Sequence, residues 1–349
     1  MMAFMSDVAK TMLLALRDNR GGEAAKHILA INPPPEAQLM SWLSARTGDI
    51  VQPFYPYAAH FEQTVTADIE ELSADPVYNA ALVFFPKNMA EGQYYLAHAL
   101  QKVKQRGRIY VCAHNKEGGM RLKKLLREAE IENINEISKH KARAVSGVKA
   151  QDMFLLQNWI DQGQMRTVAQ HNFVSQPGIY GWNKIDKGSV RLLQNLPGDM
   201  GGIGADFGSG YGYLAHHILD QNEGIKMLHV ADADARALKA CAENLDLFKA
   251  RFETHWCDLT KDDGKNAASR KFKNLDFIVM NPPFHEGKKT DVTIGQSFIM
   301  KAAKSLKSGG RLYMVANTHL PYEDILSAAF SDVEKLHQGN GFKVFQAIK

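Results

Sequence analysis

The chain of 349 residues is 45% hydrophobic and 23% charged, and its formal net charge is only +4. This composition excludes a disordered or fibrous chain, and the length allows two domains that each have a core. No apolar run approaches the roughly 20 residues that span a bilayer, so no membrane partner is expected.

The N-terminal segment predicts an amphipathic helix rather than a signal peptide. Met12, Leu13 and Leu16 have helical spacing, and no small-residue cleavage site follows them. The three cysteines are widely scattered and fit neither a disulfide framework nor a zinc site. We therefore expect buried thiols in a protein of the reducing cytoplasm.

The first half of the chain predicts an apolar strand, a helix and a second strand. Residues 80–88 (AALVFFPKN) form an apolar run that ends in proline and asparagine. Residues 93–115 add a helical pattern, a glycine and another apolar run. Residues 32–35 (NPPP) follow a stretch with helical spacing, so we interpret them as a rigid linker.

Positive charge is concentrated in residues 101–150, which contain 13 Lys and Arg against 5 Glu. Such an excess predicts a surface that binds a polyanion. The alternative is a solvated helix face, because residues 121–130 (RLKKLLREAE) have the charge spacing of a helix. On the first interpretation, the side chains expected to contact nucleic acid are Lys123, Lys124, Arg127, Lys141 and Arg143.

A domain boundary is expected near residue 155, which gives domains 1–155 and 156–349. Residues 159–182 predict a short β-hairpin that leads into the second domain. That domain shows strands alternating with helices, which predicts a parallel sheet covered on both faces. Ligands of such sheets bind beyond the carboxyl ends of the strands.

The end of the second domain repeats the plan of residues 80–115. Residues 275–283 and 297–319 match that segment in the order, type and approximate length of their elements, which indicates an internal duplication. The first copy has neither a glycine-rich loop after an early strand nor Asn-Pro-Pro in this position. We expect it to have kept the fold and lost the chemistry.

A glycine-rich turn is predicted at residues 206–212 (DFGSGYG), between a strand and a helix. Its alternate glycines let the backbone approach a ligand closely, and the helix N-terminus offers oriented N–H groups. The dinucleotide pattern G-x-G-x-x-G is absent. Asp206 would repel a pyrophosphate and attract a cation, which favours S-adenosylmethionine over NAD. The expected cofactor-binding residues of this turn are Asp206, Gly208, Ser209, Gly210 and Gly212.

Carboxylates follow the next two predicted strands. Asp232 lies 24 residues after Gly208 and can accept hydrogen bonds from both ribose hydroxyls of the cofactor. Asp234 is the competing candidate, but a helix must begin just after it, which makes it a plausible N-cap. Asp258, after the third strand, could accept from the adenine amino group or be an ordinary loop aspartate.

The fourth predicted strand ends in Asn281-Pro282-Pro283-Phe284. The Asn281 amide oxygen and the Pro282 carbonyl can accept both N–H bonds of an exocyclic amine and favour a tetrahedral nitrogen. Its lone pair would then point at the sulfonium methyl. Prolines fix φ and restrict the residue before them, so both acceptors are held in place before the substrate binds. Phe284 offers an aromatic face on which a base can stack. Prolines also simply end strands, but the position after DFGSGYG favours these four residues as catalytic, with Asn281 also facing the cofactor.

Three further features have weaker signals. His285 could touch a phosphate or a base, or make a structural hydrogen bond. Trp182 could close the site or pack internally. The 13 histidines show no metal-ligand spacing, since His216 and His217 are adjacent and point about 100° apart on a helix. No metal is expected.

With these residues in place, the chain resembles the ribosomal RNA guanine-N2 methyltransferases with duplicated methyltransferase domains. It is most similar to the small-subunit methyltransferase C group, with the large-subunit methyltransferase G group as its relative. The resemblance covers nearly the full length and is weakest over residues 1–75. The supporting stretches are DFGSGYG, VMNPPFHEG, GGRLYMVANTHLPY, GFKVFQAIK and, in the first half, FFPKN and KARAV. Residues 179–182 depart from the family, which has Phe-Ser after Pro-Gly.

The resemblance implies an α/β protein of two tandem Rossmann-like class I methyltransferase domains, the N-terminal one degenerate and serving folding and RNA binding. It implies S-adenosylmethionine as donor and a guanine of 16S ribosomal RNA as acceptor, within a ribosomal subunit or assembly intermediate, and we expect a monomer. A 23S ribosomal RNA guanine is the alternative. Carried over by motif, Asp206, Gly208, Gly210 and Asp232 bind the cofactor. Asn281, Pro282 and Phe284 bind the base.

Two other classes compete with this interpretation. DNA adenine-N6 and protein-glutamine methyltransferases more often have Tyr in the position of Phe284, and they lack the degenerate first copy. A non-catalytic RNA-binding assembly factor is suggested by the first domain alone. The intact turn at Asp206 together with Asn281 argues against that class.

Overall fold

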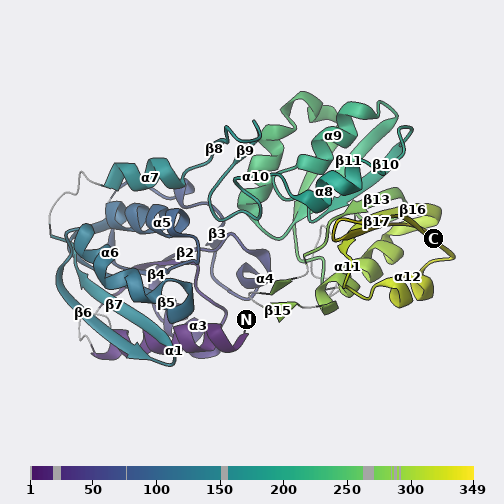
Figure 1. Ribbon diagram of the computed structural model, residues 1–349. Coiled ribbons are helices and arrows are strands. Elements are labelled where there is room, and N and C mark those ends of the chain that lie inside the picture. The colour runs from purple at the N-terminus through teal and green to yellow at the C-terminus, as the bar shows by residue number, and fades with distance from the viewer. Residues whose placement is uncertain are drawn as a thin grey trace. The chain divides into compact units, whose positions relative to one another are not determined.

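The computed structural model describes residues 2–18, 25–75, 77–150, 156–261, 271–283, 285–286, 289–290 and 292–349. The chain divides into two compact units (Figure 1). The first comprises Met1–Gln164 and Gln176–Gly178, and the second comprises Met165–Ser175 and Ile179–Lys349. Among the described residues, no helix combines the length and the apolar character needed to cross a membrane.

The first unit is built on a seven-stranded sheet in the order β3-β2-β1-β4-β5-β7-β6. Strands β3, β2, β1, β4 and β5 are parallel, whereas β7 pairs antiparallel with both β5 and β6. Its elements are α1 (Met2–Asp18), β1 (His27–Ile31), α3 (Ala37–Ser44), β2 (Thr47–Val51), α4 (Tyr55–Ala58), β3 (Val65–Thr66), β4 (Tyr78–Phe84), α5 (Met89–Lys102), β5 (Val103–His114), α6 (Leu122–Glu128), β6 (Glu132–Lys139), β7 (Ala142–Val148) and α7 (Gln157–Gly163).

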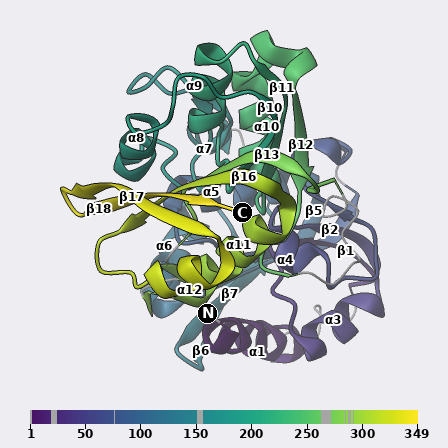
Figure 2. The same cartoon turned by 90° about the vertical axis from the view of Figure 1, so that its right-hand side faces the viewer.

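The second unit has a seven-stranded sheet in the order β12-β11-β10-β13-β16-β18-β17, and its β17–β18 hairpin is yellow in Figure 2. Its first five strands are parallel, and β18 is antiparallel to β16 and β17. Its elements are β8 (Arg166–Thr167), β9 (Val174–Ser175), α8 (Lys187–Leu193), β10 (Gly202–Phe207), α9 (Tyr213–Gln221), β11 (Ile225–Asp232), α10 (Ala235–Asn244), β12 (Phe252–Trp256), β13 (Leu275–Met280), β14 (His285–Glu286), β15 (Lys289–Thr290), α11 (Val292–Ser305), β16 (Leu306–Asn317), α12 (Glu323–Ala329), β17 (Asp332–Gly339) and β18 (Phe342–Ile348).

The two sheets share one strand order and one pattern of directions, which confirms the duplication. The expectation of an entirely parallel sheet is only partly right, because each sheet ends in an antiparallel pair. Both pairs are closed by two-residue turns with positive φ, at His140-Lys141 and at Asn340-Gly341. The predicted hairpin between residues 159 and 182 is confirmed as β8–β9.

Helices cover both faces of each sheet, as the alternation of strands and helices predicted. In the first unit, one apolar core includes residues of α5, α6 and α7, and the other includes residues of α1 and α3. Met12 and Leu16 of α1 are fully buried, as the helical spacing indicated. In the second unit, α11 and α12 contribute to one core, and α8, α9 and α10 contribute to the other.

The interpretation of residues 32–35 as a linker after a helix is wrong. These residues follow β1, an interior strand of the first sheet that lies between β2 and β4. The preceding run HILAI is almost fully buried, and a short buried strand has no alternating pattern by which it could be told from a helix.

Candidate active site

Three predicted site segments meet at the carboxyl ends of neighbouring strands in the second sheet. Strand β10 lies between β11 and β13, and Phe207 is in register with Ala231 on one side and Met280 on the other. The carboxyl ends of these parallel strands therefore lie at the same level. The residues that come next along the three strands are Gly208, Asp232 and Asn281.

The glycines of the turn have two different functions. Gly208, Gly210 and Gly212 have φ values of 80°, 55° and 90°, a region that glycine adopts without strain. A Cβ on Gly212 would lie 2.7 Å from the sulfur of Cys241, so packing requires glycine there. A Cβ on Gly210 would meet no atom within 4 Å, so that glycine borders open space that a ligand can enter.

Asp206 is a buried carboxylate toward which only the backbone N–H of Ala215 is directed in the described part of the chain. It is fully buried, and neither of its oxygens makes a hydrogen bond of normal geometry with a described residue. Burial, reinforced by the nearby charge of Asp232, raises the pKa of Asp206 to about 8. The Ser209 hydroxyl is likewise buried without a hydrogen bond of normal geometry in the described chain. Unsatisfied buried polar groups are rare in native proteins, and at this turn they fit a cationic, hydrogen-bonding ligand such as S-adenosylmethionine.

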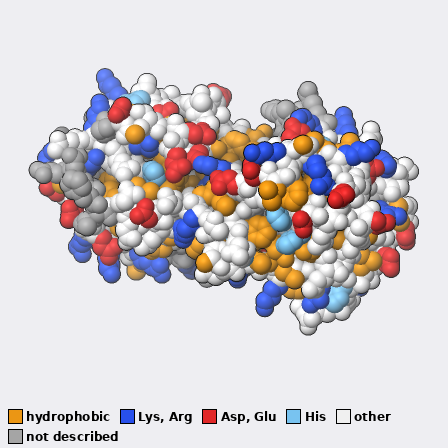
Figure 3. Space-filling model, turned by 90° about the horizontal axis from the view of Figure 1, so that it is seen from above, with side chains coloured by type: hydrophobic (Ala, Val, Ile, Leu, Met, Phe, Trp, Pro, Cys, Tyr) orange, Lys and Arg blue, Asp and Glu red, His pale blue; other side chains and the backbone are white. Residues whose placement is uncertain are grey.

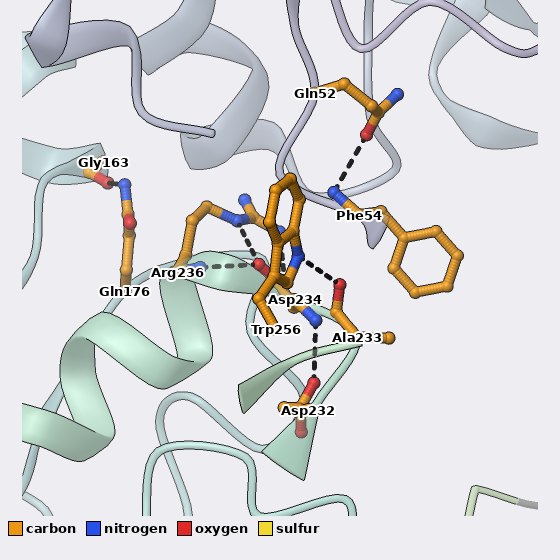
Figure 4. A network of polar contacts seen from close by, with 9 residues as sticks. All are labelled: Gln52, Phe54, Gly163, Gln176, Asp232, Ala233, Asp234, Arg236 and Trp256. Carbon is orange, nitrogen blue, oxygen red and sulfur yellow. Dashed lines mark hydrogen bonds and ion pairs between the residues drawn. The ribbon is translucent and has the colours of Figure 1, made fainter. Parts of the chain in front are cut away.

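The structure separates the two aspartates at the end of β11 (Figure 4). Asp234 is the N-cap of α10, and its carboxylate is also held by the Arg236 guanidinium at 2.7 Å. In the described chain, Asp232 accepts from the backbone N–H groups of Gly210 at 2.8 Å and Asp234 at 2.9 Å, and the backbone N–H of Ala233 is also directed at it. Burial raises the pKa of Asp232 to about 6. Each Asp232 oxygen keeps a lone pair that can accept a further hydrogen bond. Asp232 is therefore favoured over Asp234 as the acceptor for the ribose hydroxyls.

Asp258 makes the contacts of a loop aspartate. Its Oδ1 accepts from the backbone N–H of Thr260 at 2.8 Å and from the same residue's hydroxyl. Lys261 lies 3.7 Å from Oδ2. Asp258 follows β12 and is buried, so its position is compatible with an adenine contact that remains a prediction.

Asn281 is held by two acceptors from α8 and its N-cap. The Asn281 amide nitrogen donates to Asp186 Oδ1 at 2.7 Å and to the Ser189 hydroxyl at 2.9 Å. Both amide hydrogens are thereby used, which fixes the amide plane and leaves its oxygen as an acceptor. Asp186 is itself fixed, because its Oδ1 also caps α8 through the Ser189 N–H at 2.9 Å.

Sequence reasoning missed Asp186 and Ser189. The sequence did contain one signal, since Asp-x-x-Ser before an apolar run is typical of a helix N-terminus. That signal predicts a cap but not a contact with a residue 95 positions away. Tyr180, which is 69% exposed, donates to the other Asp186 oxygen at 3.4 Å.

The remaining predicted residues of this region are placed as follows. Pro282 is buried and Pro283 is exposed. Phe284 lies outside the described residues, as does the side chain of His285, so their contacts with a base stay predictions. Trp182 packs against a small apolar cluster that includes Tyr211, and the Arg166 guanidinium lies 5.6 Å from its ring.

The first unit preserves the backbone of this site. Asn32 follows β1 as Gly208 follows β10, and both have positive φ, 55° and 80°. In both units the N–H of this residue donates over 2.8 Å to the neighbouring strand, to Val51 in the first unit and to Ala231 in the second.

The side chains needed for cofactor binding are missing from the first unit. When Asn32 is aligned with Gly208, the strand registers place Ala30 at the position of Asp206 and Gln52 at the position of Asp232. Prolines at 33–35 offer no N–H groups to a ligand. The Gln52 amide instead bonds the Pro33 carbonyl at 3.0 Å and the Phe54 N–H at 3.1 Å, the latter drawn in Figure 4. The first copy has thus kept the fold without the cofactor-binding groups.

The predicted RNA-binding side chains of the first unit fall into two groups. Lys123 and Arg143 both pair with Glu136, and Lys124 lies 3.7 Å from Glu128. Burial would raise the pKa of Glu136, but hydrogen bonds from these two cations hold it below its usual range.

Arg127 and Lys141 form the second group. Both are exposed and have no acidic partner within ion-pair distance among the described residues. On the face seen in Figure 3, basic and acidic side chains are interspersed among the residues drawn in colour.

Known proteins match both halves of the chain. Residues 24–162 match the family described as "Methyltransferase small domain N-terminal", and residues 170–346 match "Methyltransferase small domain". Ribosomal RNA small subunit methyltransferase C of Shewanella pealeana is 30% identical over 288 residues, 80% of each chain. The protein of that name from Aliivibrio fischeri is 32% identical over 286 residues, again 80% of each chain.

A solved structure has the same fold over both units. It is a T. thermophilus 16S rRNA N2-guanine methyltransferase in complex with AdoMet and guanosine, with a TM-score of 0.75 and 20% sequence identity. The match covers 93% of this chain and 88% of that one. The chain therefore belongs to the two-domain ribosomal RNA methyltransferase family.

Proposed function

We propose that this protein methylates the exocyclic N2 amine of one guanine in 16S ribosomal RNA. The observation that carries the proposal is the fixed amide of Asn281, directly beyond β13 and level with the glycine turn and Asp232. The similar proteins named as small subunit methyltransferase C, and the neighbour solved with guanosine, support guanine of the small subunit as the acceptor.

The protein's contribution to the reaction is to orient a weak nucleophile. The N2 lone pair of guanine is delocalised into the ring, so the amine reacts poorly while it is planar. The Asn281 oxygen and the Pro282 carbonyl accept its two N–H bonds and favour a tetrahedral nitrogen. Since Asp186 and Ser189 already fix the amide, this orientation costs little ordering at the moment of reaction. Phe284 is the proposed stacking face for the base.

The cofactor end of the site is assigned to the glycine turn. S-adenosylmethionine supplies an electrophilic methyl group on a sulfonium. Asp206 and the Ser209 hydroxyl, both buried without hydrogen bonds of normal geometry in the described chain, would satisfy its polar and cationic groups. Asp232 would accept from the ribose hydroxyls and Asp258 from the adenine amine.

The proposed substrate is RNA within a small subunit or an assembly intermediate, in the cytoplasm, with the protein acting as a monomer. Side chains do not read a base inside an RNA helix, so the guanine must be unpaired or flipped out. Exposed Arg127 and Lys141 of the first unit are suited to contact phosphates while this occurs.

Labelled methyl transfer to isolated subunits tests the proposal. Small and large subunits from cells that lack this protein are incubated with the purified enzyme, and the modified nucleotide is mapped. We expect N2-methylguanine in 16S RNA only. Transfer to neither subunit by a protein that binds S-adenosylmethionine would exclude the enzyme, and transfer to the large subunit alone would assign it to 23S RNA.

Substitution of Asn281 tests the mechanism. Asn281→Ala removes one of the two acceptors, and we expect kcat to fall by about 100-fold or more, as for other pre-aimed polar groups. Asn158→Ala, which truncates an exposed asparagine on α7, is the matched control and should keep full activity. Full activity of Asn281→Ala would refute the mechanism while leaving the enzyme class intact.

A further inference from the structure

Two histidines and a glutamate converge on the two outer strands of the second sheet. His229 lies on β11, and Glu253 and His255 lie on the neighbouring edge strand β12. Both imidazoles are buried, and the Glu253 side chain is 39% exposed. None of the three belongs to the glycine turn, the ribose acceptor or the Asn281 site.

The three potential ligand atoms form a compact triangle. His229 Nδ1 and His255 Nε2 are 2.9 Å apart, and Glu253 Oε2 lies 3.6 Å from the first and 3.7 Å from the second. The point in the plane of the three atoms that is equidistant from them lies about 2.0 Å from each, and a displacement of about 0.7 Å from that plane, as in a tetrahedral site, makes this distance about 2.1 Å. This distance equals the length of Zn–N and Zn–O bonds in proteins, which is about 2.0–2.2 Å.

A hydrogen bond between two neutral imidazoles explains only one side of this triangle. It accounts for the 2.9 Å between the nitrogens of His229 and His255. It leaves Glu253 Oε2 almost equidistant from both nitrogens at distances too long for hydrogen bonds. A shared metal ion accounts for all three separations.

We propose that His229, Glu253 and His255 bind a divalent transition-metal ion, with zinc as the best match. Two imidazoles and one carboxylate form a ligand set of zinc, and a water completes the tetrahedron. The ion would tie β12, which has a single neighbour in the sheet, to β11.

The surroundings of the cluster support this assignment. The ring of Phe272 packs against both imidazoles, with centroids 6.1 Å from His229 and 5.0 Å from His255, and forms a rigid apolar wall. Lys271 pairs with the other oxygen of Glu253, Oε1, and leaves Oε2 turned toward the histidines. The ammonium of Lys271 would repel the ion and lower its affinity without blocking its place.

Metal content after dialysis tests the site directly. The metal-free protein is dialysed against micromolar Zn²⁺, and bound zinc is measured together with S-adenosylmethionine affinity as a check on folding. We expect the wild type to bind one more zinc ion per chain than the His255→Gln or Glu253→Gln variant. His60→Gln, which removes an exposed histidine of the first unit, is the matched control and should keep the wild-type content.

Two results would overturn the proposal. One is equal zinc content in the wild type and in Glu253→Gln, a variant that keeps the shape of the side chain. The other is a Lys271→Met variant that binds zinc no more tightly than the wild type, because removal of that ammonium should raise the affinity of a Glu253-containing site at least severalfold.

Discussion

At the scale of single residues, the orientation of Asn281 depends on Asp186. Asp186→Ala removes an acceptor of the Asn281 amide and the N-cap of α8. We expect kcat to fall about tenfold or more with little change in S-adenosylmethionine affinity, because only the acceptor geometry is loosened. Loss of the cap should lower the free energy of unfolding by about 1 kcal/mol.

A second cap separates these two effects. Asn88 caps α5 of the first unit through the Glu91 N–H, so Asn88→Ala removes a cap far from the reacting groups in sequence. It should lower stability by a similar amount and leave kcat unchanged. If Asp186→Ala kept wild-type kcat, Asp186 would be a structural cap alone.

The buried Asp206 makes cofactor affinity depend on pH. With its pKa raised to about 8, this carboxyl is mostly neutral at pH 6 and ionises as the pH rises. Only the ionised form attracts a cation, so the dissociation constant of S-adenosylmethionine should fall up to tenfold per pH unit between about pH 6 and 8 and then level off. Calorimetric titration from pH 6 to 8.5 measures this dependence, and Asp206→Asn should bind weakly with no such slope.

The same carboxyl affects stability with the opposite sign. In the cofactor-free protein the folded state retains the Asp206 proton above pH 3.8, whereas the unfolded chain has released it. Folding is therefore favoured by this group at low pH, and its contribution is lost as the pH rises toward about 8.

The site residues proposed from the sequence are those that belong to a local motif. The turn with Asp206 and the Asn-Pro-Pro segment each carry a physical signal within a few residues. Asp186 and Ser189 could not be assigned in this way, because their role exists only once α8 packs beside the end of β13. The cluster at His229 was missed for the same reason: neighbouring strands bring its ligands together from 26 positions apart.

At the scale of elements, β4 and β13 were predicted from their apolar runs, whereas β1 was misread and the antiparallel pairs were not predicted. β4 and β13 are apolar runs bounded by turn residues, a signal that is typical of buried strands. β6 and β17 are edge strands with mostly partly buried or exposed residues, so they lack an apolar pattern. The dipeptide Asn340-Gly341 is the usual signal of a two-residue hairpin turn and could have identified β17–β18.

This turn allows a clean test of backbone strain. Gly341 has a φ of 84°, and a Cβ there would meet no atom within 4 Å. Gly341→Ala should therefore lower the free energy of unfolding by about 1–2 kcal/mol through conformation alone. Gly198 has equally open surroundings without a positive φ, so Gly198→Ala should be neutral or slightly stabilising. Equal effects of the two substitutions in denaturant unfolding would contradict this account.

At the scale of the whole molecule, duplication left one copy with a site and one without. The same strand order occurs in both units, and so does the same hydrogen bond directly beyond β1 and β10. Asn32, followed by prolines, replaces the first glycine of the turn, and Gln52 uses its amide to hold that loop. The first unit is therefore free to supply another function, and we expect RNA binding by residues 101–150, where 13 Lys and Arg stand against 5 Glu.

We expect the ion pairs of the first unit to decide which of its basic residues bind RNA. Arg127 and Lys123 lie on the same helix, α6, but Lys123 is paired with Glu136 whereas Arg127 is exposed without such a partner in the described chain. A phosphate contact by Arg127 would release a counterion, whereas Lys123 would first have to leave its acid. Arg127→Ala and Lys141→Ala should each weaken binding to the small subunit.

Salt dependence distinguishes this binding from a general loss of structure. Each phosphate contact removed should reduce the slope of log affinity against log salt by about one. Lys123→Ala is the matched control on the same helix: it should leave the slope nearly unchanged and lower stability by at most about 1 kcal/mol, as expected of a partly exposed ion pair. If Lys123→Ala and Arg127→Ala reduced the slope equally, pairing with Glu136 would not govern RNA binding, and the whole basic segment would act as one diffuse surface.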